Sequence, residues 1–531
     1  MTSAGDAFGK TIGNEKIGVY TSDDVRGFNP VEAGNARMEG LYFDQQERPT
    51  PRLINGSTIR VGITAQGYPF PAPTGIVDYR LRTIAKDPGV SVEFEQSSNG
   101  GRALSIDTTF PIIGDRLGGF AGGILRKAQT PQGSGGDVRA FSLSLAWRPY
   151  AQAEVIAFTS GIDNSNETAA PIIFPAGDVL PPQIRRGQFI GQDWAQRNAK
   201  SRNSGVIAKF PLGQFRLEAG LFRSLKSTRI QFSDQLRGTQ ANGQVSNHVI
   251  IADGDNLDSS TSGEVRLTRN WGSGKIRHQL VATVRGRAKD RDFGGAKTIF
   301  SGPGSVDPIV IARPSFTLGD NDHDRVRQMT YGLGYGAEWA NHGSINLSLS
   351  KSHYRKAVTF ANPALPVVRT GDDPLLYSMG GSLFITPRLV IYGGYVRGLE
   401  ESLIAPEIAV NRGEAPPAIL TRQMDAGIRY KLTPQFTFIA GVFSVRKPYF
   451  NLDRSLRFGQ LGVVENRGIE LSIAGQIAPG LSLIGGTVLL DPKITGAAVS
   501  SGTIGQRPVG SIRRRSVLNL DQSWVLTITS R

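Results

Sequence analysis

Apolar and polar residues alternate with a period of two through most of the chain. Over residues 141–148, the apolar side chains of Phe141, Leu143, Leu145 and Trp147 are separated by serine, alanine and arginine. Successive side chains of a β-strand point to opposite faces, so this pattern predicts a strand with one apolar and one polar face. Clear copies of the pattern cover residues 215–221, 331–339 and 345–350, and noisier ones cover 102–110, 116–127, 152–160, 277–288, 380–397, 421–447, 464–476 and 480–490. The chain from about Val90 onward is therefore predicted to be all-β.

Alternation alone fits a soluble sandwich as well as a membrane barrel, but the connections and the aromatic residues favour the barrel. Short turns at 211–213 and 433–434 alternate with long connections, as the two ends of an outer-membrane barrel require. Loops of such length are uncommon in compact soluble domains. The long connections are 161–203, 236–260, 289–324, 356–375 and 399–419, and the aromatic residues near strand ends are Trp147, Tyr150, Trp271, Trp339 and Tyr430. We predict a transmembrane antiparallel β-barrel of about 18 to 22 strands.

Composition agrees with a barrel and excludes several other classes. The 531 residues are 39% hydrophobic, with a mean hydropathy of -0.19. No apolar run reaches the roughly 18 residues of a membrane-spanning helix, whereas a barrel strand exposes only alternate residues to lipid. The absence of cysteine excludes disulfides and thiolate metal sites, and five scattered histidines leave little for a zinc enzyme.

The net charge of +15 raises the question of an anionic partner. Lysine and arginine are spread singly along the chain, and the only dense run is residues 513–515. No helix-turn-helix, zinc-finger or RRM pattern accompanies them. We therefore favour anionic lipopolysaccharide or an anionic ligand over nucleic acid, because a basic surface or lumen attracts either through its long-range field.

Four segments ahead of the barrel are unusually rich in glycine, arginine and aromatic residues. In chain order they are Val25–Phe28 (VRGF), Glu39–Tyr42 (EGLY), Ile59–Gly62 (IRVG) and Tyr68–Tyr79. Together they resemble the plug of the TonB-dependent outer-membrane receptors, although glutamate replaces the usual aspartate in the second segment and a single glycine replaces a pair in the fourth. A chance RGF would be the simpler reading of one segment, but not of four in the family's order. The plug motif residues are Arg26, Gly27, Phe28, Gly40, Arg60, Gly62 and Gly75.

Glycine and arginine suit such a plug physically. Glycine allows close approach of the backbone and positive φ angles in a crowded globule. A buried arginine can donate to several carbonyls or to a carboxylate at once.

Segments late in the chain are similar to the barrel of the same family. They are Tyr392–Gly398, Met424–Tyr430, Asn466–Leu471 and the run from Pro479 to Asp491. The resemblance covers nearly the whole chain. It implies a partial plug in residues 1–85, inside the lumen of a barrel formed by residues 86–531.

Both ends of the chain depart from the family pattern. Residues Met1–Asp6 lie close to the RGF segment and no signal-peptide pattern precedes them. Residues Thr527–Arg531 do not form an amphipathic last strand that ends on an aromatic residue. We expect a receptor truncated at both ends, with an incomplete carboxyl-terminal part of the barrel.

The resemblance implies a function in the cell outer membrane. The expected activity is TonB-dependent transport of a ligand, an iron-siderophore complex, with the TonB system, outer-membrane lipid and lipopolysaccharide as partners, no resident cofactor and no nucleic acid. A passive porin-like channel and a non-functional receptor fragment are the alternatives. The candidate ligand-binding residues are Tyr42, Phe43, Tyr68 and Phe70, each of which could equally be a residue of the plug core.

Enzyme and metal motifs are incomplete. Lys297-Thr298 would end a phosphate loop, but Ala296 stands where glycine is required. Asp253, Asp255 and Glu264 have the spacing of a calcium loop, which Leu257 and Asp258 interrupt. The acidic residues Asp320, Asp322 and Asp324 around His323 fit an ordinary acidic turn. We expect neither a catalytic nor a metal site.

Overall fold

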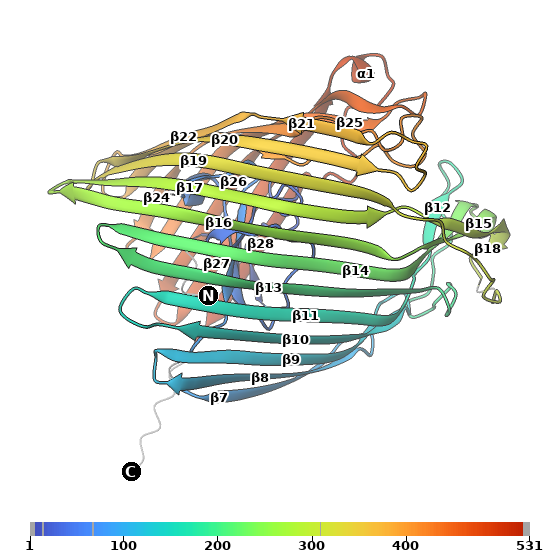
Figure 1. Cartoon of the computed structure of the whole chain (residues 1–531), viewed down its shortest axis with the longest axis horizontal. Coiled ribbons are helices and arrows are strands. Elements are labelled where there is room, and N and C mark those ends of the chain that lie inside the picture. Colours follow the sequence, from blue (N-terminus) through green and yellow to red (C-terminus); the bar gives the residue numbers. More distant parts are fainter. Residues whose placement is uncertain (1–5, 13–14, 66–67, 86, 308–309, 524–531) are drawn as a thin grey trace, which may run out of the picture.

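The structure is a computed structural model that describes residues 6–12, 15–65, 68–85, 87–307 and 310–523. A long antiparallel barrel surrounds a small mixed sheet formed by the amino-terminal part of the chain (Figure 1). The predicted all-β barrel is thereby confirmed. The expectation about the last residues, Thr527–Arg531, lies outside the described residues.

The strands β7 to β28 are ordered around the barrel, with antiparallel registers between neighbours along its wall. The wall strands are β7 (Gly89–Gln96), β8 (Arg102–Ile113), β9 (Leu117–Gln129), β10 (Gly135–Trp147), β11 (Glu154–Thr168), β13 (Gln196–Leu212), β14 (Phe215–Thr239), β16 (Asn256–Ser273), β17 (Ile276–Phe293), β19 (Asp322–Trp339), β20 (Gly343–Thr359), β22 (Leu375–Phe384), β23 (Leu389–Glu400), β24 (Ile419–Thr433), β25 (Phe436–Leu452), β26 (Phe458–Ala478), β27 (Leu481–Thr495) and β28 (Arg514–Gln522). Each segment predicted from alternation lies within one of these strands or extends at most two residues beyond it, except that 380–397 and 421–447 each span two strands and the turn between them.

The two ends of the barrel differ in their connections. At one end the strands are joined by tight turns, such as those between Leu212 and Phe215 and between Thr433 and Phe436. At the other end the sheet extends through β12 (Ile172–Pro175), β15 (Gln244–Asp253), β18 (Lys297–Ser305) and β21 (Val368–Asp372), and a short helix α1 (Ala497–Ser500) lies in the last long connection (Figure 1). The segment 236–260, predicted to be a long loop, is instead mostly strand, because β14, β15 and β16 continue beyond the wall in hairpins.

The outward face of the barrel is the apolar face that the alternation predicted. Leu143, Phe215 and Leu347 are 38%, 37% and 44% exposed, although the strands that carry them have a hydrogen-bonded neighbour on each side. Trp147 and Trp339 are the last residues of β10 and β19, where they border the short turns. This arrangement is that of an apolar lipid-facing band with an aromatic rim. No helix of the described residues is both long and apolar enough to span a membrane.

The small sheet in the lumen has six strands in the order β2-β1-β5-β6-β3-β4. They are β1 (Lys10–Ile12), β2 (Glu15–Ile17), β3 (Ala36–Met38), β4 (Leu41–Tyr42), β5 (Ile54–Arg60) and β6 (Ile76–Leu81), with a 3-10 turn η1 (Gly62–Ala65) after β5. Within this small sheet β3 and β6 pair in parallel, whereas the other described pairs are antiparallel. We refer to residues 6–85 as the plug.

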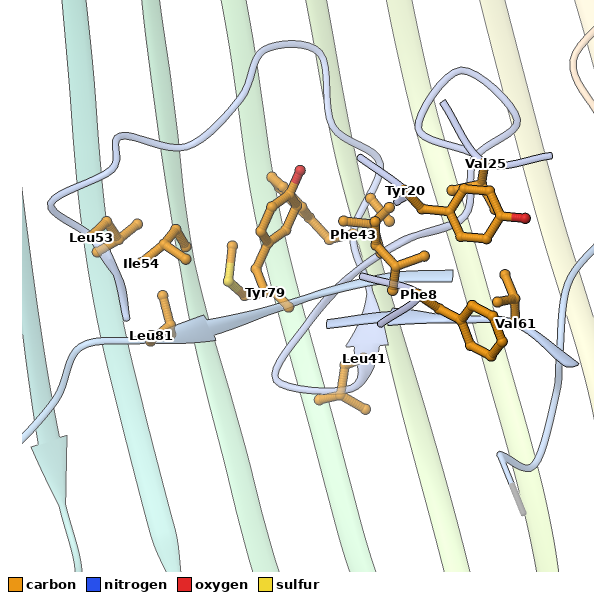
Figure 2. Close-up of a cluster of buried hydrophobic side chains, with 14 of the residues drawn as sticks. Phe8, Tyr20, Val25, Leu41, Phe43, Leu53, Ile54, Val61, Tyr79 and Leu81 are labelled. Carbon is orange, nitrogen blue, oxygen red and sulfur yellow. The ribbon is translucent and has the colours of Figure 1, made fainter. Parts of the chain in front are cut away.

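One apolar core joins the plug to the barrel wall. Buried plug residues such as Phe8, Leu41 and Leu53 cluster around the small sheet (Figure 2). The ring of Phe43 meets Phe222 of β14 edge-on, with 5.6 Å between ring centroids. Because the plug fills the lumen here, lumen-facing Ser144 is fully buried and its hydroxyl donates to the Arg82 carbonyl of the plug. The lumen-facing side of the alternation is therefore packed rather than water-filled at this level.

Candidate functional site

The VRGF segment forms a tight hairpin turn that places Arg26 against the barrel wall. Val25 and Phe28 pair as an antiparallel bridge, and Arg26 and Gly27 between them have φ values of 55° and 77°. The Arg26 guanidinium is fully buried and donates from Nε and Nη2 to the two carboxylate oxygens of Glu470 in β26, at 2.8 and 2.9 Å. Such a two-point pair fixes both distance and orientation.

Further contacts hold the buried guanidinium in its charged form. Asp425 lies 3.6 Å from Nη1, the Tyr20 hydroxyl also donates to Glu470, and the Phe443 ring centroid is 4.3 Å from the guanidinium carbon. Burial opposes the charge, but the attraction of Glu470 outweighs it and raises the pKa of Arg26 above its ordinary value. We call Arg26 and Glu470 the first plug anchor.

Gly27 is required by the close approach of the wall. Asn466 Nδ2 donates to the Arg26 carbonyl at 2.9 Å, and a Cβ on Gly27 would lie 2.5 Å from that nitrogen. Phe28 is partly buried, and the Lys447 ammonium lies 4.5 Å from its ring centroid. The barrel partners Asn466 and Glu470 belong to the Asn466–Leu471 segment that resembles the receptor family. The sequence pattern alone does not identify either residue as a partner of the plug.

The second segment meets the wall through another buried carboxylate, Glu264 of β16. The Tyr42 amide donates to Glu264 Oε2 at 2.9 Å, and Arg266 Nη2 donates to Glu264 Oε1 at 2.7 Å and to the Gly40 carbonyl at 3.1 Å. The Tyr68 hydroxyl also donates to the Gly40 carbonyl, at 2.7 Å. The structure therefore brings Gly40, Tyr42 and Tyr68 together at one point of the wall, which we call the second plug anchor.

Burial at this anchor suppresses ionisation of the Tyr42 phenol. Tyr42 is 6% exposed, and desolvation raises its pKa to about 12 although Arg287, Arg285 and Arg37 lie nearby. The guanidinium carbons of Arg37 and Arg285 lie 5.1 and 5.4 Å from the centroid of its ring.

The remaining motif residues shape the plug itself. Gly75 has φ +82°, and a Cβ there would lie 2.8 Å from a methyl group of Val61 and 3.1 Å from the Arg60 carbonyl. The Arg60 guanidinium lies 3.7 Å from Asp78 in β6. Gly62 lies next to the Arg26 guanidinium at the start of η1. The motif residues thus occupy the plug core and its contacts with the wall.

A cavity of about 770 Å³ opens at the end of the barrel that carries the long connections. We call it the vestibule. Its floor is formed by the plug segments 23–32 and 44–47, and its sides by β17, β19 and the connection 401–413. Tyr42, Phe43, Tyr68 and Phe70 do not line it. Phe43 and Phe70 are instead buried, with Phe70 against Gly332 of β19.

Charged residues dominate the vestibule, and each of its cations already has a carboxylate partner. Nine acidic and six basic residues line the cavity. The ion pairs are Lys226–Glu47 at 2.9 Å, Arg287–Asp44 at 3.0 Å, Lys289–Glu401 at 3.2 Å, Arg291–Asp258 at 3.3 Å, Lys356–Asp324 at 3.1 Å and Arg412–Asp322 at 2.9 Å. A basic lumen was one of the expectations drawn from the overall charge of +15, but the lining of this cavity has more acids than bases.

Glu401 is the central acid of this lining. It contacts Lys289, Arg287 and Lys356. Burial opposes its ionisation, but these three cations hold the pKa of Glu401 well below its usual range.

The acidic motifs noted in the sequence do not assemble a metal site in the described part of the chain. Glu264 faces the plug, whereas Asp253 ends the distant β15. Asp322 pairs with Arg412, and His323 Nδ1 lies 2.7 Å from Asp292.

Comparisons with known proteins agree with this geometry. No family model matches the chain. Over 209 residues it is 28% identical to the ferrichrome receptor FcuA of Yersinia enterocolitica, a match that covers 36% of this chain and 27% of that receptor. The chain therefore aligns with little more than a quarter of this curated relative.

Solved receptor structures match almost the whole chain. The ferric preacinetobactin receptor BauA of Acinetobacter baumannii matches with a TM-score of 0.73 and 20% identity, over 92% of this chain and 75% of that one. The ferric-catecholate import receptor Fiu of E. coli matches with a TM-score of 0.77 and 12% identity, over 97% and 80%. At these identities the matches establish the fold, a plugged β-barrel. The chain is thus similar in fold to solved siderophore receptors and, over 209 residues, similar in sequence to a curated ferrichrome receptor.

Proposed function

We propose that this protein takes up an iron-siderophore complex across the outer membrane with energy from the TonB system. The observation that carries the proposal is a plug that fills the lumen directly beneath an outward vestibule, tied to the wall by buried ionic anchors. A ligand held in the vestibule contacts plug and barrel together. Binding of the ligand can therefore shift the position of the plug. A passive channel needs no such coupling between its ligand and a plug.

We further propose that two parts of the chain have different roles. Residues 1–85 act as the plug and residues 86–531 as the barrel. Arg26, Gly27, Phe28, Gly40, Arg60, Gly62 and Gly75 keep the plug folded and seated. Transport requires the two anchors to open, because their donors and acceptors lie on opposite sides of the plug–barrel boundary. A ligand contact by Tyr42, Phe43, Tyr68 or Phe70 stays a prediction, and it needs movement of the plug because these residues lie outside the vestibule.

Lipopolysaccharide is proposed as a partner of the outer barrel face. Arg422 of β24 and Arg446 of β25 are exposed and face each other in register towards the long-connection end. Lipid phosphates are suitable partners for such paired guanidinium groups.

The test is iron uptake by a host that lacks its own siderophore receptors. The full chain is expressed with a signal peptide, surface labelling establishes its location, and growth is measured on ferric siderophores with and without TonB. The proposal predicts growth that depends on TonB. Growth without TonB would indicate a passive channel, and no growth with the protein at the surface would indicate a non-functional fragment.

A further inference from the structure

The charge and hydrogen-bonding groups of the vestibule define the class of ligand that it can accept. We propose, on the basis of the proposed uptake function, that the vestibule binds a ferric chelate of zero or positive net charge that carries hydrogen-bond donors, and that it rejects trianionic chelates. The whole chain carries a charge of +15, so this preference is opposite to the one that overall charge suggests.

The lining of the vestibule carries more negative than positive side chains. Nine carboxylates face six cations, so the lining has three more negative than positive groups. The three acids without a cation of their own in the lining are Asp23, Glu32 and Glu407. Glu407 shares Arg412 with Asp322, and Glu32 has no ion pair within the described ranges. Asp23 pairs at 2.5 Å with Arg48, which lies outside the lining, so that a net excess of two negative charges remains. A concave site with low-dielectric walls concentrates this field on whatever enters it.

The cations of the vestibule are already paired with carboxylates. Each of the six is within 3.3 Å of at least one carboxylate oxygen that also lines the vestibule. A trianionic ligand would have to displace these carboxylates, several of which are buried. Removing one member of a buried pair leaves the other charge without compensation, which is strongly unfavourable.

One carboxylate oxygen of the vestibule, on Asp324, can accept a hydrogen bond. Asp324 is 2% exposed and lines the vestibule. Its Oδ2 lies 3.1 Å from Lys356, but its Oδ1 has no donor among the residues that the structure describes. Buried polar atoms are normally satisfied, so this oxygen is suited to a ligand that supplies an ammonium, amide or hydroxyl donor. The only aromatic residue in the described lining is Phe293, so stacking on catechol rings has little to support it.

The potential in the vestibule can be measured without any siderophore. The chain contains no cysteine, so Leu403→Cys, at an exposed position of the lining, gives a single thiol. Its rates of reaction with a cationic trimethylammonium and an anionic sulfonate thiosulfonate reagent are compared with those of Ala151→Cys, in the exposed turn at the other end of the barrel. We expect the ratio of cationic to anionic rate to be several-fold higher at position 403, and added salt should reduce the difference.

Two charge-reversal variants test whether the ratio of reaction rates depends on the charges that line the vestibule. Glu32→Lys removes an acid of the lining, whereas Asp115→Lys makes the same change in an exposed turn between β8 and β9. The ratio at position 403 should fall with Glu32→Lys and stay unchanged with Asp115→Lys. A faster anionic reaction at position 403, or a ratio that Glu32→Lys leaves unchanged, would overturn the inference.

Ligand selection is then measured on the full chain in detergent by quenching of tryptophan fluorescence. The probes are a neutral ferric tris-hydroxamate, the same chelate with an added ammonium group, and a trianionic ferric tris-catecholate. The first two should bind at least about tenfold more tightly than the third, because like-charge contacts are strongly unfavourable at such a site. Equal or tighter binding of the trianion refutes the inference. Binding of none of the chelates, together with a faster cationic thiol reaction, refutes the uptake function and supports the charge preference alone.

Discussion

Single residues decide how the plug is held. Arg26 and Glu470 lie 444 positions apart in the chain, yet their side chains form a two-point ion pair that is almost inaccessible to solvent. The carbonyl of Arg26 accepts from Asn466 on the same barrel strand. Backbone and side chain of one plug residue are therefore fixed by one segment of the wall.

Breaking this pair should loosen the plug. Arg26→Ala leaves Glu470 buried without its counter-ion, which is expected to cost about 3–5 kcal/mol. The predicted result is faster hydrogen exchange and proteolysis in residues 17–28, measured on the protein in detergent, with the barrel strands unaffected. Arg139→Ala, at an exposed position of β10, is the matched control. Unchanged protection of the plug in Arg26→Ala would show that the pair does not seat it.

Tyr42 gives a residue-scale prediction for pH. Its pKa is raised to about 12, above the ordinary value of 10.0. The folded protein therefore holds this proton more tightly than the unfolded chain does. The contribution of the protonated Tyr42 phenol to the free energy of unfolding is fully present below pH 10. It is lost as the pH rises from 10 to about 12. Ultraviolet titration of the wild type and Tyr42→Phe should show one phenol fewer ionising near pH 12 in the variant. Ionisation of Tyr42 near pH 10 would contradict its burial.

At the scale of elements, each barrel strand separates lipid from lumen by simple alternation. β20 shows this clearly, because Leu347 faces outward between Ile345 and Leu349, whereas its neighbour Asn346 lines a lumenal cavity of about 750 Å³ near the short turns. The lumen-facing Ser144 is packed against the plug and has no room for an arginine. Whether an inward-facing position of the barrel tolerates arginine therefore depends on whether the plug packs against that position.

The matched pair Leu347→Arg and Asn346→Arg tests this arrangement. An arginine on the lipid face should reduce the folding free energy by about 2–4 kcal/mol. An arginine at position 346 extends into the cavity and should change it little. Urea titration of folding into lipid vesicles measures both values. Similar losses for the two variants would mean that β20 is not oriented as described.

At the level of the whole molecule, the plug lies in the lumen between the vestibule and the cavity near the short turns, and it contributes to the lining of both. Deletion of residues 6–85 should therefore convert a closed protein into an open pore. Conductance in planar bilayers is expected to be large and steady for the deletion variant and absent for the full chain. Circular dichroism of both proteins controls for folding of the barrel. An equally closed deletion variant would show that loops, and not the plug, seal the barrel.

Alternation along the chain is sufficient to predict the strands of the barrel wall and the face of each strand that is apolar. A period of two is a local property, and burial in lipid acts on each outward residue such as Leu347 independently of distant parts of the chain. The turn and close-approach requirements of Gly27 and Gly75 were also visible locally, because few residues other than glycine accept these backbone conformations.

Which wall residues contact the plug, and which side chains line the vestibule, follow from the three-dimensional fold. Glu470 and Glu264 became anchors, Ser144 became buried, and the plug aromatics came to lie outside the vestibule, through contacts between residues hundreds of positions apart. The sign of the vestibule's charge likewise depends on which side chains converge at one end of the barrel. The net charge of the chain carries no such information, because it sums outward-facing and inward-facing residues alike.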